Sequence, residues 1–169
     1  MTDEQRLWWR QAKSDLELFE RLGQINARPC YQLQALQMAI EKLAKAYGWR
    51  NRQPPAATHR VFVAFIRQQN SRPKAEQDRL VAVLKLKSRR QLLSRLTILL
   101  QVGREIEGLS PAIANAAGGP NLEYPWPHHA PAFGPASYDF PIWQRLSEPD
   151  GKQFLDGIKK LIDGFEQVS

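Results

Sequence analysis

The amino-acid sequence predicts an all-α protein, and three observations carry that prediction. Apolar residues recur every three or four positions through most of the chain, which is the spacing of one helix face. No stretch alternates apolar and polar residues as a half-buried strand does. Helix-start signals precede several of the periodic stretches. We therefore expect a single all-α domain over residues 1–169, with four long helices, one short helix and a long Pro/aromatic-rich loop before the last helix.

Two long helices are expected first, over residues 2–22 and 29–47. Thr2 opens the first helix and has the spacing of a capping box with Gln5. Pro29 suits the first turn of the second helix, where its missing N–H is not needed. The two apolar faces carry Trp8, Ala12, Leu16 and Phe19, then Leu36, Ile40, Leu43 and Tyr47. Each helix is expected to stop at a glycine, Gly23 and Gly48.

The sequence pattern of residues 58–108 predicts a short helix followed by one or two longer helices. Thr58 has the character of an N-cap for a third helix, and the chain breaks at residues 70–73 before helical periodicity resumes. Ser88 and Gln91 repeat the capping-box spacing ahead of a leucine-rich stretch. The sequence leaves open whether residues 74–108 form one kinked helix or two.

Residues 110–146 differ in composition from the rest of the chain. Six of the twelve prolines lie between Pro120 and Pro141, and aromatic residues are interleaved with them. A disordered linker contains few aromatic residues. We therefore expect an ordered, extended loop that its rings hold against the helices. The last helix is expected to begin at Ser147, with Pro149 in its first turn.

Composition excludes several classes of protein. A single cysteine, Cys30, excludes an internal disulfide and a cysteine-based zinc cluster. No window holds about 18 uncharged apolar residues, so no membrane span is expected. The acidic N-terminus has no apolar segment behind it, so no secretory signal is expected. The expected location is the cytoplasm.

The charge of the chain is concentrated in one segment. The net charge is +7, but residues 50–95 alone hold 12 basic residues against Glu76 and Asp78, a local net charge of +10. The remainder of the chain therefore carries −3. Such a segment suits RNA or a nucleotide as a partner. A solvated helix face covered by long basic side chains explains the same segment equally well.

One arginine–histidine pair within this segment has the residue types needed for RNA cleavage. His59 can move a proton from a ribose 2′-hydroxyl, and Arg52 can stabilise charge on the phosphorus. The alternative is that His59 is simply a polar residue at a helix start. His128 and His129 have no metal-ligand spacing, and no glycine-rich nucleotide motif occurs, so neither metal nor cofactor is expected. The expected nucleic-acid contacts are Arg50, Arg60, Lys85, Lys87, Arg89 and Arg90.

The order of these features resembles the HEPN family of helical nucleotide-binding domains. Ala12 and Asp15-Leu16 lie in the first helix, the block from Gln37 to Ala46 in the second, Thr58-His59 before the third, and Tyr124-Pro125 before the last. The resemblance implies an up-and-down bundle of four to five helices, often a homodimer, and members of the family frequently partner a small nucleotidyltransferase. Many members are metal-independent RNases of toxin–antitoxin systems.

The resemblance also implies roles for two residues and leaves other functions open. The RNase motif of the family maps onto Arg52 and His59. The sequence departs from the family in the prolines Pro54 and Pro55 and in Glu123, so a member that binds without cleaving is also compatible. The alternative is a non-enzymatic interaction module that docks a protein through the Pro/aromatic loop or the helix 92–106. A third hypothesis is a helical bundle that binds a nucleotide without hydrolysing it.

Overall fold

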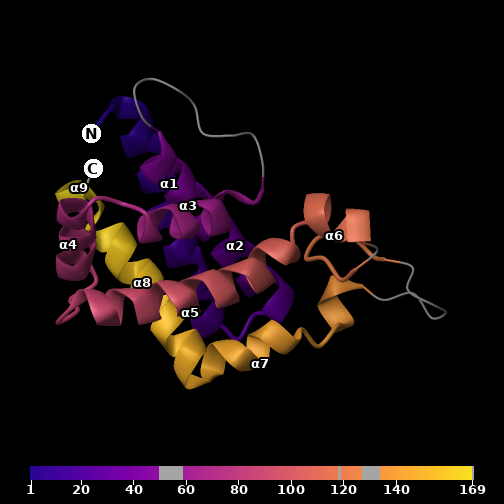
Figure 1. Ribbon diagram of the computed structural model, residues 1–169. Coiled ribbons are helices and arrows are strands. Elements are labelled where there is room, and N and C mark those ends of the chain that lie inside the picture. Colours follow the sequence, from indigo (N-terminus) through magenta and orange to yellow (C-terminus); the bar gives the residue numbers. More distant parts are fainter. Residues whose placement is uncertain (50–58, 118, 127–133, 169) are drawn as a thin grey trace.

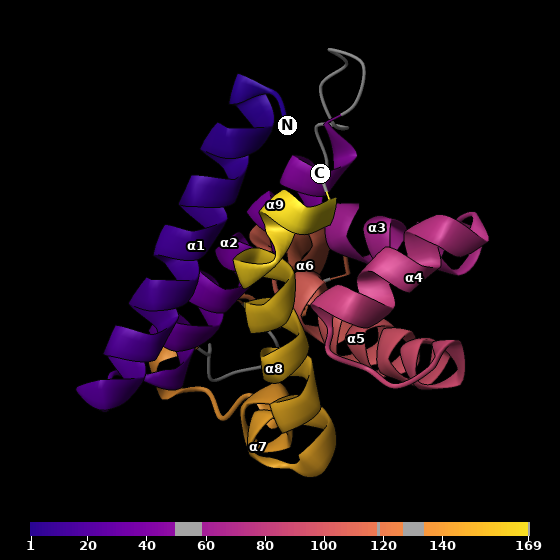
Figure 2. The ribbon, with the colours of Figure 1, turned by 90° about the vertical axis from the view of Figure 1, so that its left-hand side faces the viewer.

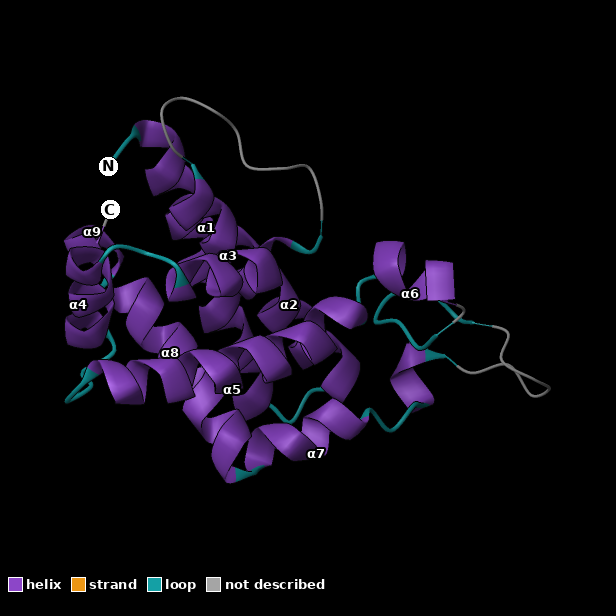
Figure 3. Cartoon of the chain, in the orientation of Figure 1, coloured by secondary structure: helices purple, strands orange, loops and turns teal. Residues whose placement is uncertain are grey.

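The computed structural model describes residues 1–49, 59–117, 119–126 and 134–168, and every regular element within these ranges is a helix (Figure 3). The all-α prediction is therefore confirmed. In chain order the elements are α1 (Asp3–Gln24), α2 (Pro29–Gly48), α3 (Val61–Asn70), α4 (Lys74–Val83), α5 (Arg89–Gly108), α6 (Pro111–Ala117), the 3₁₀ helix η1 (Pro135–Ser137), α7 (Pro141–Ser147), α8 (Pro149–Asp163) and α9 (Phe165–Val168).

The first two helices form an antiparallel pair (Figures 1 and 2). The capping box is present as predicted: Gln5 N–H donates to the Thr2 hydroxyl at 3.3 Å, and the Gln5 side chain accepts from Thr2 N–H at 2.8 Å. The helix does not stop at Gly23, because it continues to Gln24. The turn that follows uses Asn26 at a φ of 50°, a left-handed conformation that asparagine tolerates.

The open question over residues 74–108 is settled as two helices, α4 and α5. Lys85 lies between them at a φ of 54°, which breaks the helical path. Ser88 caps α5 by accepting from Gln91 N–H at 3.3 Å. The Gln91 side chain reaches one residue further back than predicted and accepts from Lys87 N–H at 2.7 Å. The α5 helix then runs from α4 at one side of the molecule to α6 at the other (Figure 1).

The segment 110–146 is partly helical, which corrects the expected extended loop. It contains α6, η1 and α7, and each of these begins at a proline. The expected ring contacts are present where the structure describes the segment. Trp126 and Tyr138 meet edge to face at 5.2 Å between ring centroids, and Tyr138 and Phe140 do so at 4.9 Å. Trp126 and Phe140 are buried, so rings hold this segment against the helices.

The last long helix begins two residues later than predicted, at Pro149, because Ser147 ends α7. The α8 helix lies between α1 and α5 (Figure 2). Two aromatic side chains hold its C-terminal turn through hydrogen bonds. Trp9 Nε1 donates to the carbonyl of Ile162 at 2.7 Å, and the Tyr47 hydroxyl donates to that of Leu161 at 3.0 Å.

The core places α3 directly against α5. Phe62 on α3 is fully buried and packs against Phe154 of α8 at 6.1 Å between ring centroids. Gly103 makes this approach feasible, since a Cβ there would lie 2.5 Å from the Phe62 ring. The start of α3 is thereby fixed beside the C-terminal half of α5. Within the described ranges, no helix is both long and apolar enough to cross a membrane.

Candidate functional site

A cluster of charged side chains forms where α2, the start of α3 and the end of α5 meet. Glu41 comes from α2, His59 lies two residues before α3, and Glu107 comes from the last turn of α5. Both glutamates are almost fully buried, at 4% and 3% exposed. A buried carboxylate is costly unless it has partners, so the partners of each define the chemistry of the site.

Glu41 is held as a carboxylate by a set of donors. Its Oε1 accepts from Lys45 Nζ at 2.6 Å, and its Oε2 accepts from Gln37 Nε2 at 3.3 Å and contacts His59 Nδ1 at 2.9 Å. Burial alone would raise the pKa of Glu41, but the hydrogen bonds and charges of Lys45 and His59 outweigh it, and the pKa lies below its usual value. Glu41 is therefore ionised at neutral pH and acts only as an acceptor.

The ionised state of Glu41 fixes the orientation of the His59 ring. An acceptor-only carboxylate requires Nδ1 of the histidine to donate, so the neutral ring carries its proton on Nδ1. Nε2 then keeps a lone pair. The His59 side chain is 49% exposed. The arrangement is that of a base whose second nitrogen is held by a buried acid, a pattern used in general base catalysis.

Glu107 caps the start of α3 from the neighbouring helix. Its Oε1 accepts from the backbone N–H groups of Phe62 at 2.6 Å and Val63 at 3.2 Å. The first N–H groups of a helix lack partners within the helix, and Arg60 at the N-cap position contributes no side-chain cap. Thr58, the predicted cap, lies outside the described residues. Glu107 therefore satisfies two of the first N–H groups of α3.

The pKa of Glu107 is raised to about 7. Burial is the largest cause, and the negative charge of Glu41 adds to it. The two backbone hydrogen bonds and the charge of Arg60 act in the opposite direction. Two buried glutamates in one cluster thus have pKa values displaced in opposite directions, a pattern frequent at functional sites.

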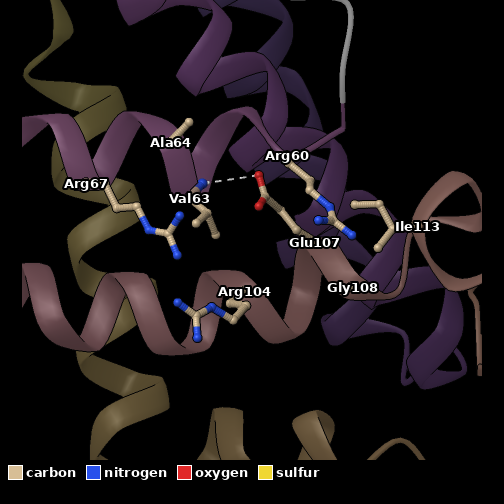
Figure 4. A pocket seen from close by; sticks show the side chains of 8 residues that line it. All are labelled: Arg60, Val63, Ala64, Arg67, Arg104, Glu107, Gly108 and Ile113. Atoms are coloured by element: carbon tan, nitrogen blue, oxygen red, sulfur yellow. Dashed lines mark hydrogen bonds between the residues drawn. The ribbon is translucent and has the colours of Figure 1, made fainter. Parts of the chain in front are cut away.

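Three arginines surround a pocket of about 430 Å³ beside this cluster (Figure 4). Arg67 from α3 and Arg104 from α5 point toward one another across its mouth, and Arg60 lies on the other side of Glu107 (Figure 4). All three arginines are exposed. Neither Arg67 nor Arg104 forms an ion pair with any residue that the structure describes. We call this hollow the arginine pocket; Val63, Ala64, Glu107, Gly108 and Ile113 complete its lining.

The sequence-predicted site residues fall in different places. Arg50 and Arg52, the latter the arginine of the expected Arg52–His59 pair, lie outside the described residues, and His59 contacts Glu41. Arg60 lines the arginine pocket. Arg89 and Arg90 lie in the first turn of α5 and Lys85 and Lys87 precede that helix, whereas Arg104 of the pocket lies about 22 Å further along the helix than Arg89, at 1.5 Å per residue. Arg89 is paired there with Asp78 through two bonds of 2.8 Å.

The residues that sequence reasoning missed are Glu41 and Glu107 as a buried pair and Arg104 as a pocket residue. A signal for the glutamates was present. Glu41 and Glu107 each follow a buried position by four residues, Gln37 and Gly103, and so lie on the inward stripe of their helices. An acidic residue on such a stripe indicates a paired, buried charge. Arg104 has no comparable signal, because exposed arginines are common on helices.

No grouping of metal-ligating side chains is found among the described residues, and His128 and His129 are not among them. No family model, curated protein or solved structure matches the chain.

Proposed function

We propose that the chain is an HEPN-like domain, a bundle of four to five helices that binds RNA and cleaves it without a metal ion. It would work in the cytoplasm and, as the resemblance implies, as a homodimer beside a small nucleotidyltransferase. The observation that carries the proposal is the contact between Glu41 and His59, which leaves one imidazole nitrogen of His59 as a base; the next residue, Arg60, lines the arginine pocket.

The proposed reaction uses only proton transfer and charge stabilisation. Nε2 of His59 takes the proton of a ribose 2′-hydroxyl, and that oxygen attacks the adjacent phosphorus. The bond from phosphorus to the 5′-oxygen breaks, and the protonated imidazole returns its proton to the leaving oxygen. The products are a 2′,3′-cyclic phosphate and a 5′-hydroxyl end. Arg52 retains its predicted role of stabilising charge on the phosphorus.

The arginine pocket supports the binding half of the proposal. Exposed guanidinium groups without carboxylate partners favour phosphate, because each can form two parallel hydrogen bonds to it. Arg67 and Arg104 are two such groups, and the charge of Arg60 on the same hollow adds to their attraction for a polyanion at low salt. Arg60, which lines the pocket, directly follows His59 in the chain, and the proposal therefore expects a phosphate bound in the pocket to lie near the proposed base.

The test is cleavage of a single-stranded RNA by wild-type protein and by His59→Gln. The glutamine should reduce the cleavage rate by at least about 100-fold and leave RNA affinity within a factor of about two. The same oligonucleotide made of deoxyribose is the substrate control, because it lacks the attacking hydroxyl. It should bind and stay intact. Full cleavage by His59→Gln, or cleavage of the deoxyribose strand, would contradict the mechanism.

The interaction-module alternative gains little from the fold. The leucine stripe expected to dock a partner faces the core of the chain itself, since Leu92, Leu96 and Leu99 are buried. Only Leu93 of that helix is prominently exposed among the large apolar residues of the described ranges. A partner would therefore have to use the Pro/aromatic segment, and Tyr124→Ala, at an exposed ring of that segment, should then weaken its binding while the helices still fold.

A further inference from the structure

A second hollow adjoins the arginine pocket and differs from it in chemistry. It has a volume of about 410 Å³ and shares Arg104, Gly108 and Ile113 with the arginine pocket. Its own walls are mostly apolar and come from the end of α5, from α6 and from the segment leading into α7. We call it the apolar groove; Leu109, Ala114, Tyr138, Phe140 and Ile142 are among its walls.

Contacts within the chain hold the walls of the apolar groove in place without a bound ligand. Phe140 and Ile142 are buried, and Tyr138 meets Phe140 edge to face. The backbone of Leu122 donates to the carbonyl of Leu109 at 3.2 Å, which ties the segment after α6 back to the end of α5. A preformed apolar hollow binds a flat apolar group without the cost of ordering its own walls.

We propose that the apolar groove binds one unstacked base of a single-stranded RNA whose phosphates lie on the arginine pocket. This inference rests on the proposed function and adds its substrate class. In a single strand, phosphates and bases alternate along one chain, and a base can leave the stack to enter a protein hollow. The three residues shared by the two hollows make them one continuous surface, charged at one end and apolar at the other.

Duplex RNA does not match this surface. Its bases are stacked and paired in the interior of the helix, so a side-by-side phosphate site and apolar groove cannot both be occupied. The expected substrate is therefore a single strand, or a loop or bulge within a folded RNA.

Gly119 offers a variant that fills the apolar groove and spares the arginine pocket. Gly119 lines the apolar groove and does not line the arginine pocket. A Cβ added there would come no closer than 4.0 Å to another atom. Gly134 is the matched control, since it lines neither hollow and a Cβ there would meet nothing within 4 Å. Gly119→Leu and Gly134→Leu thus add the same side chain at two uncrowded positions, and thermal unfolding checks that both variants fold.

The experiment measures the affinity of three probes for the full chain: a fluorescent single strand of about 12 nucleotides, the same strand with abasic ribose throughout, and the corresponding duplex. Wild type and Gly134→Leu should bind the single strand about tenfold more tightly than either other probe. Gly119→Leu should lose that tenfold preference and bind the abasic strand unchanged.

Two results would contradict the binding of a base in the apolar groove, and both can be told apart from a result that contradicts RNA binding itself. Equal affinity of Gly119→Leu and Gly134→Leu for the single strand would assign the groove to another occupant, such as an apolar acidic peptide. Equal affinity of wild type for the single strand and the abasic strand would show that no base is bound. If wild type binds none of the three probes even at low salt, the proposed function fails as well.

Discussion

At the scale of single residues, the site depends on two buried carboxylates that the protein treats in opposite ways. Glu41 has charged and polar donors on both oxygens and stays ionised. Glu107 has two backbone N–H groups on a single oxygen and a pKa near 7. The difference follows from the partners: a lysine and a histidine offset the cost of burying one charge, and two neutral amides offset less of the other.

Glu107 should make the free energy of unfolding depend on pH. Its pKa is higher in the folded chain than the unfolded value of 4.5, so the folded state binds more protons between pH 4.5 and about 7. Its contribution is fully present below pH 4.5 and is lost as pH rises through 7. Relative to Glu107→Gln, wild type should therefore lose up to about 3 kcal/mol between pH 5 and pH 8. Urea unfolding of both proteins at each pH measures the difference, and parallel pH curves would contradict it.

Glu41→Gln should impair the orientation of His59. The amide can present either an N–H or an oxygen to Nδ1, so the ring is no longer held in the tautomer that leaves Nε2 as a base. RNA cleavage should fall by about 100-fold. The tautomer is read from the ring nitrogen signals in NMR spectra, which should show Nδ1–H in wild type and a mixture in the variant. Gln37→Ala is the control, because it removes only the weaker donor at 3.3 Å and should change cleavage little.

At the scale of elements, α3 is positioned by α5 and not by its own sequence. Its first N–H groups are capped by Glu107, and Phe62 fits against Gly103. Both contacts link residues more than 40 positions apart in the chain. The start of α3 places Arg60 and follows directly on His59, so helix packing determines the geometry of the site.

Gly103→Ala should destabilise the chain although alanine favours helices. The new Cβ would lie 2.5 Å from the fully buried Phe62 ring, and that ring is enclosed by Phe65 and Phe154. We expect a loss of about 1 to 3 kcal/mol in the free energy of unfolding. Gly108→Ala in the same helix is the matched control, since its Cβ would meet nothing within 4 Å. It should leave stability unchanged or slightly increased, and chemical denaturation distinguishes the two variants.

The sequence predicts the helices best where local chemistry decides them. The Thr2 and Ser88 caps and the apolar stripes of α1, α2 and α8 depend on residues a few positions apart, and all are present. The prolines of the segment 110–146 predict an extended chain. Pro111, Pro135 and Pro141 instead occupy first helical turns, where proline fits as well as it does at Pro29. Which of these prolines begin a helical turn depends on tertiary packing, so the proline content of a segment does not predict its helices.

The candidate site is partly predictable too, because some of its features are local in the sequence and others depend on tertiary packing. His59 and Arg60 are identifiable from residue type and their place before a helix. The pairing of His59 with Glu41 and the capping of α3 by Glu107 join three separate helices, so no spacing within the sequence encodes them. The basic segment 50–95 is continuous along the chain, but in the fold Arg60 and Arg67 lie near the end of α5 and Lys85, Lys87, Arg89 and Arg90 lie at its start.

At the scale of the whole molecule, the distribution of charge predicts how binding responds to salt. For a single strand, each phosphate contact adds about 0.7 to the slope of log affinity against log salt concentration. Arg67→Gln and Arg104→Gln should each weaken RNA binding and reduce that slope by about 0.7. Lys152→Gln on the exposed side of α8 is the control and should change neither. Titrations at several salt concentrations measure the slopes.

The variant Lys87→Gln tests whether a bound RNA strand reaches the basic residues at the start of α5. Lys87 lies at the α4 end of α5, far from the arginine pocket. A reduced slope in this variant for a long strand, and not for a short one, would show that RNA runs along α5. An unchanged slope with both strands would confine binding to the arginine pocket and contradict the assignment of Lys85, Lys87 and Arg90 as nucleic-acid contacts.

The cap that Glu107 supplies to α3 also ties the site to the order in which the chain folds. The amides of Phe62 and Val63 are protected only while α5 is docked, because their acceptor belongs to that helix. Their exchange with deuterated water therefore reports the separation of α3 from α5, whereas amides in the middle of α3 report the fraying of the helix itself. Any opening that exposes these two amides releases the N-terminus of α3 and with it the placement of Arg60 and His59. The candidate site exists only in molecules in which these distant segments have already joined.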